Sequence, residues 1–82
     1  MYYLYILKCS DGTLYTGITV DLVRRVAEHN SSDLGSRYTR GRRPVKLTFS
    51  KEFVDRSIAS KEEARIKNLS RKNKLNMIKL KN

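Results

Sequence analysis

The sequence of 82 residues predicts a small α/β domain with a three-stranded antiparallel sheet flanked by three helices. Two short apolar segments near its start are separated by Asp11-Gly12, a pair typical of a β-hairpin turn. Residues 45–53 alternate between apolar and polar, and the segments after them carry apolar residues at helical spacing. We expect one domain over residues 1–82, in the order strand, strand, helix, strand, helix, helix.

The hairpin is expected to pair a strand at Tyr2–Lys8 with a return strand at Leu14–Ile18. Apolar residues occupy both odd and even positions of the first strand, which is typical of a strand covered on both faces. Pairing the two segments brings Tyr5 and Tyr15 close together, so two phenols are expected on neighbouring strands.

The first helix is expected to begin after Asp21, a suitable N-cap, and to run to about His29. Its expected buried stripe consists of Leu22, Val23 and Val26. The following segment, residues 30–44, is rich in Ser, Gly and Arg and is expected to be a loop. A loop of this length in so small a domain is usually functional or mobile.

The last three elements follow from alternation and capping. The strand at Val45–Phe53 is expected to place Val45, Leu47 and Phe49 on one half-buried face. Asp55 can cap a helix that reaches about Asn68, and its expected stripe is Ile58, Ala59, Ile66 and Leu69. Ser70 can cap a helix at Arg71–Lys79 whose expected inward residues are Leu75, Met77 and Ile78.

The charge of the chain indicates its partner. Eighteen Lys and Arg residues against eight Asp and Glu residues give a net charge of +10. Residues 1–20 contain one base, Lys8, and one acid, Asp11, so the whole excess lies in the rest of the chain. A basic surface of this size indicates a polyanionic partner, most often nucleic acid. The charge has two alternative explanations. It keeps a small domain soluble, or it binds ribosomal RNA nonspecifically.

Cys9 is the only cysteine, which excludes an internal disulfide and a zinc site built from several thiolates. Its place at the end of an apolar strand favours a buried or half-buried thiol over a nucleophile. No apolar stretch approaches the roughly 20 residues of a membrane span. The start of the chain also lacks the charged segment of a secretory signal. We therefore expect a cytoplasmic protein with no membrane association.

Tyr5 and Tyr15 are the first candidates for chemistry. Strand tyrosines commonly pack their rings and leave the hydroxyl in water. Gly17, however, follows Tyr15 on the same side of its strand, and a glycine there clears room for a close ligand.

Arg25 and His29 lie four residues apart and therefore share a helix face. The planar guanidinium of arginine suits bidentate contact with a phosphate. His29 has two interpretations that the sequence leaves open. It is either a C-terminal helix cap or a proton carrier and phosphate donor on the face of Arg25.

Glu62 and Glu63 are the candidate metal ligands. Periodicity alone places Glu62 in the middle of the apolar stripe and Glu63 at its edge, which singles out Glu62. One carboxylate suffices for Mg²⁺, which keeps several waters and takes other ligands from a substrate phosphate. The absence of a larger acidic cluster in the sequence therefore favours a single metal ion.

The predicted loop at 30–44 contains the candidate residues for nucleic-acid contact. Cations interleaved with an aromatic ring suit phosphate contact and base stacking. These residues are Arg37, Tyr38, Arg40, Arg42 and Arg43.

The tripeptides Tyr3-Leu4-Tyr5 and Tyr15-Thr16-Gly17, followed in order by an arginine, a histidine and a glutamate, resemble the GIY-YIG nuclease family. The resemblance is closest to its small single-domain bacterial members, and it extends from Tyr2 to about Leu75. Tyr3-Leu4 stands where the family name has Gly-Ile, and Thr16 replaces the central Ile, at positions that vary in the family.

The resemblance implies catalytic roles for Tyr5, Tyr15, Arg25 and His29. It also implies Glu63 as the catalytic ligand of Mg²⁺ or Mn²⁺, because the spacing to Ile66 and Leu69 matches the family register; Glu62 stays the alternate.

The expected function is hydrolysis of DNA phosphodiester bonds by a metal-dependent endonuclease, with branched or damaged DNA in repair or recombination as its setting. The alternative is a noncatalytic nucleic-acid-binding module with the same fold. A third interpretation is a nuclease that cuts only with a partner protein supplying substrate recognition, because many relatives carry separate DNA-binding domains.

Overall fold

The computed structural model describes residues 1–31 and 34–81. Its sheet consists of β1 (Tyr2–Lys8), β2 (Leu14–Thr19) and β3 (Lys46–Phe53), antiparallel and in the spatial order β2-β1-β3. The helices are α1 (Leu22–Ser31), α2 (Arg37–Arg40), α3 (Arg56–Lys67) and α4 (Arg71–Lys81). The predicted fold class and order of long elements are confirmed. The single-turn helix α2, inside the predicted loop, is an addition.

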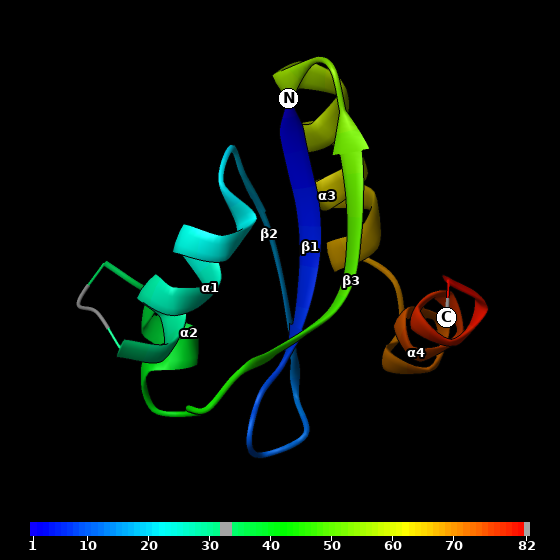
Figure 1. Cartoon of the computed structure of the whole chain (residues 1–82). Coiled ribbons are helices and arrows are strands. Elements are labelled where there is room, and N and C mark those ends of the chain that lie inside the picture. Colours follow the sequence, from blue (N-terminus) through cyan, green and yellow to red (C-terminus); the bar gives the residue numbers. More distant parts are fainter. Residues whose placement is uncertain (32–33, 82) are drawn as a thin grey trace.

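The central strand β1 is buried on both faces, as its continuous apolar sequence predicts. Figure 1 shows α1 and α2 on one side of the sheet and α3 and α4 on the other. On the α1 side, Leu22 and Val26 pack against a core of Tyr5, Leu7, Cys9 and Val45. On the α3 side, the core is Leu4, Ile6 and Ile66, with apolar residues of β2, β3 and α4 around it.

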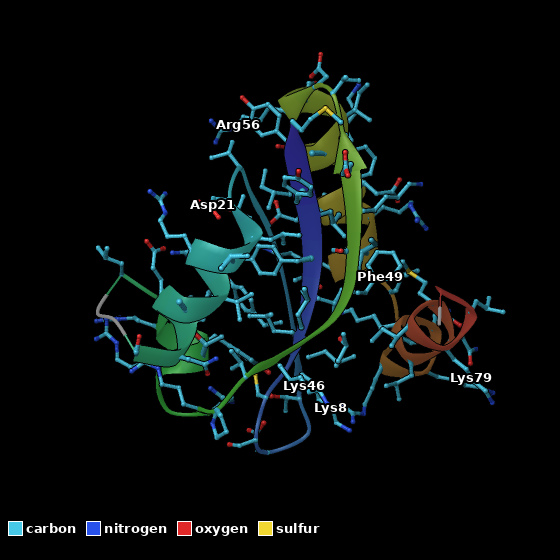
Figure 2. All side chains as sticks on the ribbon, viewed as in Figure 1. Lys8, Asp21, Lys46, Phe49, Arg56 and Lys79 are labelled. Atoms are coloured by element: carbon cyan, nitrogen blue, oxygen red, sulfur yellow. The ribbon has the colours of Figure 1, made fainter. Side chains whose placement is uncertain are left out.

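A β-bulge in β3 overturns the predicted single apolar face of this strand. Leu7 pairs with Leu47, whereas its neighbour Ile6 pairs with Phe49, so Thr48 is an extra residue in β3. The bulge reverses the side on which later residues lie. Val45 therefore packs in the α1-side core and Phe49 in the α3-side core, where Figure 2 labels it.

The three predicted N-caps are confirmed. Each side chain accepts a hydrogen bond from a backbone amide in the first turn of its helix. The Asp21 carboxylate accepts from the Arg24 amide at 3.1 Å, and the Asp55 carboxylate accepts from the Ser57 amide at 2.6 Å. The Ser70 hydroxyl accepts from the Asn73 amide at 3.2 Å. The Asp11-Gly12 turn is also confirmed, with φ of 85° at Gly12.

Each predicted helix stripe contains one residue that faces solvent instead. Val23 is 84% exposed, Ile58 is 50% exposed and Leu75 is 40% exposed. In α1 the buried side is completed by His29, which the apolar pattern omitted, so the helix turns Val23 outward. In α3 the buried residues are Ala59 and Ile66, roughly 100° around the helix from Ile58.

Candidate active site

The site is organised around His29, which is fully buried between β1 and α2. Its Nε2 lies 2.9 Å from the Tyr5 hydroxyl, and its Nδ1 lies 2.8 Å from the Thr39 hydroxyl. One imidazole therefore joins the central strand, the end of α1 and the short helix α2. The C-terminal cap interpretation of His29 does not describe this position, because both ring nitrogens are bound to side chains.

The short helix α2 contributes two polar groups around Nδ1. The Ser36 amide approaches Nδ1 at 3.4 Å, and the Thr39 hydroxyl lies 2.8 Å from it. The single proton of this hydroxyl is donated to the Ser36 carbonyl at 3.1 Å. On the other side of the ring, Nε2 and the Tyr5 hydroxyl share one hydrogen bond, whose direction depends on the tautomer of the imidazole.

The surroundings keep His29 neutral. Burial, reinforced by the nearby charge of Arg25, lowers the pKa of His29 from 6.5 to about 4. Burial also raises the pKa of the Tyr5 hydroxyl, while the Arg25 guanidinium acts on it in the opposite direction. At neutral pH the pair is therefore a neutral phenol and a neutral imidazole.

Tyr15 lies beside this pair, at a ring-centroid distance of 6.5 Å from Tyr5. Its ring meets the His29 ring edge-on at 5.2 Å and stacks on Tyr38 of α2 at 5.8 Å. The Arg42 guanidinium lies 4.1 Å from the centroid of Tyr38. The predicted proximity of Tyr5 and Tyr15 is confirmed, and aromatic neighbours fix the Tyr15 ring in place.

Two glycines allow this packing. A Cβ on Gly17, the cross-strand partner of Tyr5, would lie only 2.5 Å from the Tyr5 hydroxyl oxygen. A Cβ on Gly35 would lie 2.7 Å from the Glu28 carbonyl oxygen, where the chain passes close to the end of α1. The predicted role of Gly17, room for a close neighbour, is met by Tyr5 itself rather than by an added ligand.

Arg25 lies at the edge of the site. Its Nη1 donates to the Glu28 carboxylate at 2.9 Å and to the Leu34 carbonyl at 2.7 Å. The Arg25 side chain is 27% exposed, whereas that of Arg24 is 68% exposed. Arg25 is thus the arginine held against the Tyr5–His29 pair, and its guanidinium still reaches solvent.

Glu62 and Glu63 lie on opposite sides of the Ala59–Ile66 stripe of α3, and both are half-buried. Glu62 pairs with Arg65, and Glu63 pairs with Lys67 at 3.3 Å. The charge of Glu63 is among the smaller influences that raise the pKa of Tyr5, after burial. In residues 1–31 and 34–81 no three acidic, His or Cys side chains form a metal-binding cluster.

The arginines after α1 divide into two groups. Arg42 binds the Asp11 carboxylate at 3.0 Å and the Tyr38 carbonyl at 2.8 Å. Arg43 donates to the carbonyl of His29 through Nε and to that of Glu28 at 3.4 Å. Both guanidiniums therefore stabilise the loop around the site. Arg37 and Arg40, on α2, are exposed.

Thr39 and Ser36 are site residues that the sequence analysis missed. Ser36 caps α2 by accepting from the Thr39 amide at 3.2 Å, and Thr39 is fully buried. A serine three residues before a threonine is a capping pattern that predicts this turn, although it does not predict contact with His29.

Comparison with known proteins identifies the family. A model described as the GIY-YIG catalytic domain matches residues 1–76. The chain belongs to the GIY-YIG family. This is a nuclease superfamily whose members generally use divalent metal ions.

Relatives of this GIY-YIG protein include the UPF0213 protein of Desulfotalea psychrophila. It is 54% identical over 78 residues, which cover 95% of this chain and 71% of the relative. The chain also resembles the solution NMR structure of the UPF0213 protein from Bacillus halodurans, with 43% identity and a TM-score of 0.64. That match covers 99% of this chain and 86% of the other. These names specify no reaction, so the chemistry has to be inferred from the site.

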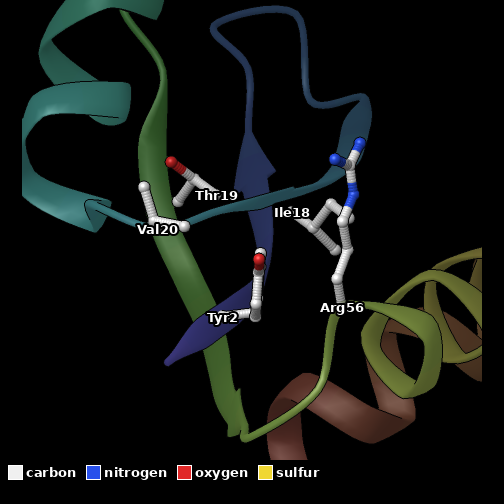
Figure 3. A pocket seen from close by; sticks show the side chains of 5 residues that line it. All are labelled: Tyr2, Ile18, Thr19, Val20 and Arg56. Carbon is white, nitrogen blue, oxygen red and sulfur yellow. The ribbon is translucent and has the colours of Figure 1, made fainter.

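A separate hollow of about 160 Å³ lies where β1 begins and β2 ends. Figure 3 shows it between Tyr2 and Arg56, with Ile18, Thr19 and Val20 around it. None of the candidate catalytic residues lines it. In the described part of the chain, no helix is long and apolar enough to cross a membrane.

Replacement of Gly17 by Ala should destabilise the protein by roughly 1–3 kcal/mol, because the new methyl group displaces the Tyr5 ring. Urea unfolding measures the change. Gly41→Ala is the matched control, since a Cβ there meets nothing within 4 Å. Equal stability of the two variants would contradict the close approach.

Stability should fall as the pH drops from about 6.5 towards 4, because the unfolded chain protonates His29 while the folded protein resists protonation. The full difference between these pKa values corresponds to roughly 3 kcal/mol. Urea unfolding between pH 7.5 and 4.5 measures it, with His29→Gln as the comparison. A wild-type curve no steeper than that of the variant would refute the buried neutral imidazole.

Proposed function

We propose that this protein is a metal-dependent endonuclease that hydrolyses phosphodiester bonds in DNA. The observation that carries the proposal is the packing of two phenols, a neutral imidazole and a half-exposed guanidinium at one place in a chain of charge +10. Phosphodiester hydrolysis requires a positioned water, stabilisation of the anionic transition state and an anion-binding surface. These side chains can supply all three.

In this proposal the Tyr15 oxygen orients the attacking water and, as the phenolate, accepts its proton. An ordinary phenol has a pKa of about 10, so this role near neutral pH requires a neighbouring cation. The oxygen of the water bonds to phosphorus, and the bond to the leaving oxygen breaks. The products are a phosphate monoester and a hydroxyl group. Contacts of the Tyr15 ring with His29 and Tyr38 support this role, because they hold the hydroxyl in one position before substrate binds.

Arg25 and Tyr5 bind the scissile phosphate. The Arg25 guanidinium donates to two phosphate oxygens in the planar geometry that suits arginine. The Tyr5 hydroxyl, held 2.9 Å from His29 Nε2, contacts a phosphate oxygen. His29 therefore positions Tyr5 and stays neutral, and it is not a metal ligand in this scheme.

The residues present fit a single divalent ion held by Glu63. Its carboxylate is half-buried, with 22% of the side chain exposed, and its charge reaches Tyr5. Mg²⁺ binds nucleic-acid enzymes through one or two carboxylates, waters and substrate phosphate, so one acid meets its needs. When bound, the metal would offset the charge that develops on the phosphate and on the leaving oxygen.

The direct test is incubation of the purified protein with branched, flapped and linear DNA, and with RNA of the same sequences, in the presence and absence of Mg²⁺ or Mn²⁺. Metal-dependent cleavage of DNA is the expected result. Binding of these substrates without cleavage under any condition would favour a noncatalytic nucleic-acid-binding module. Cleavage of RNA alone would correct the substrate class.

Glu63→Gln should abolish metal-dependent cleavage and leave the fold intact, because Gln keeps the shape and removes the ligand charge. Glu62→Gln is the matched control, since this neighbouring acid is equally half-buried and pairs with Arg65. Single-turnover cleavage and circular dichroism of both variants measure the effect. Loss of cleavage in Glu62→Gln with normal activity in Glu63→Gln would reassign the metal ligand.

Tyr15→Phe should lower the cleavage rate by roughly 10²- to 10⁴-fold and change DNA affinity little, because the hydroxyl acts on the water while binding rests on the basic surface. Tyr3→Phe, on the same hairpin outside the site, is the control. Cleavage kinetics and fluorescence anisotropy separate the two quantities. Equal cleavage by the two Phe variants would make Tyr15 a packing residue only.

A further inference from the structure

A hollow of about 200 Å³, distinct from the one in Figure 3, lies at the hairpin end of the sheet and is lined by two cations. Its lining residues are Thr13, Leu14, Tyr38, Arg71 and Lys74. They come from three parts of the chain that are distant in sequence: the β1–β2 hairpin, α2 and α4. The Arg71 guanidinium lies over the hairpin turn, with Nη2 4.0 Å from the position of a Cβ on Gly12.

The cations of this hollow have no acidic partner among the residues that the structure describes. Neither Arg71 nor Lys74 forms an ion pair with a described carboxylate, and none of the lining residues is acidic. The nearby Asp11 carboxylate binds Arg42 through one oxygen and Thr13 through the other. The hollow therefore has a local excess of positive charge.

The adjacent strands extend this excess. Leu14, which lines the hollow, pairs with Lys8 of β1, and Lys8 pairs with Lys46 of β3. Figure 2 shows Lys8 and Lys46 side by side at the hairpin end. Like charges directly opposite each other in a sheet reduce its stability. A bound anion at this end of the sheet would offset the repulsion.

Tyr38 connects the hollow to the candidate active site. The same ring lines the hollow and stacks on Tyr15 at a centroid distance of 5.8 Å. One side chain, that of Tyr38, therefore separates Tyr15 from the hollow that Arg71 and Lys74 line. A nucleic-acid strand carries a phosphate at every nucleotide, so its next phosphates would reach these cations.

We propose that Arg71 and Lys74 bind a backbone phosphate of the nucleic-acid strand whose neighbouring phosphate occupies the candidate active site, with Tyr38 between the two positions. We call this the α4 phosphate site. It rests on the proposed function for the identity of the ligand. The site gives α4 a role in holding the strand on one side of the bond that is cut.

The test is binding of a labelled single-stranded thymidine oligonucleotide by fluorescence anisotropy, with EDTA present so that no metal-dependent cleavage occurs. Arg71→Gln/Lys74→Gln should bind roughly tenfold more weakly than the wild type, and its slope of log K against log salt should be smaller by about 0.7. Lys72→Gln/Lys79→Gln removes the same charge from α4 outside the hollow. It should lose clearly less affinity. Equal losses in the two double variants would overturn the site.

A second measurement keeps the conclusion independent of folding and of general charge. Oligonucleotides with one neutral methylphosphonate, moved along the strand, remove single phosphates. The wild type should lose affinity at a position where Arg71→Gln/Lys74→Gln loses none, which identifies the contacted phosphate. Identical profiles for both proteins would refute the contact. Absence of metal-dependent cleavage, with the contact present, would refute the endonuclease and leave the phosphate site standing.

Discussion

The burial of one neutral imidazole is the constraint on which the rest of the candidate site depends. His29 is fully buried, and its two nitrogens bind Tyr5 of β1 and Thr39 of α2. A buried polar ring is stable only when both nitrogens find partners. This requirement fixes α2 against the end of α1 and sets the orientation of the Tyr5 hydroxyl. The aromatic neighbours of Tyr15 then follow, because its ring packs on His29 and on Tyr38 from the same short helix.

The two-sided burial of β1 explains how so small a domain holds such a site. Leu4 and Ile6 contribute to the α3-side core, so the opposite face can carry Tyr5 and its polar partners. The bulge at Thr48 serves both faces, because it directs Leu47 and Phe49 to different sides of the sheet. Arg43 closes the loop by donating to the carbonyl of His29. The basic loop therefore has a structural role in part. Arg42 and Arg43, two of its four arginines, bind groups of the protein around the site.

Local features were predictable from the sequence, and tertiary ones were not. The hairpin turn and the caps at Asp21, Asp55 and Ser70 each depend on bonds within a few residues. The helix faces depend on what the helix packs against. Val23 was assigned inward because apolar spacing ignores a buried histidine. His29 lies roughly 120° around the helix from Val23, on the far side of Leu22 and Val26, so the buried face is shifted away from Val23. The bulge in β3 also depends on tertiary pairing and leaves no signal in an alternating sequence. The predicted face of Phe49 was therefore wrong.

The wrong inward assignment of Ile58 also affected the choice between Glu62 and Glu63. Periodicity favoured Glu62 because the stripe was taken to include Ile58, which shifts its centre towards Glu62. Ile58 is exposed, so the true stripe is centred between Ala59 and Ile66, and the two glutamates flank it. The helix pattern then prefers neither acid. Both acids pair with a base on the same helix, Glu62 with Arg65 and Glu63 with Lys67, and the charge of Glu63 has in addition a small effect on Tyr5. The preference for Glu63 therefore rests on the family register, with its spacing to Ile66 and Leu69, and stays a prediction.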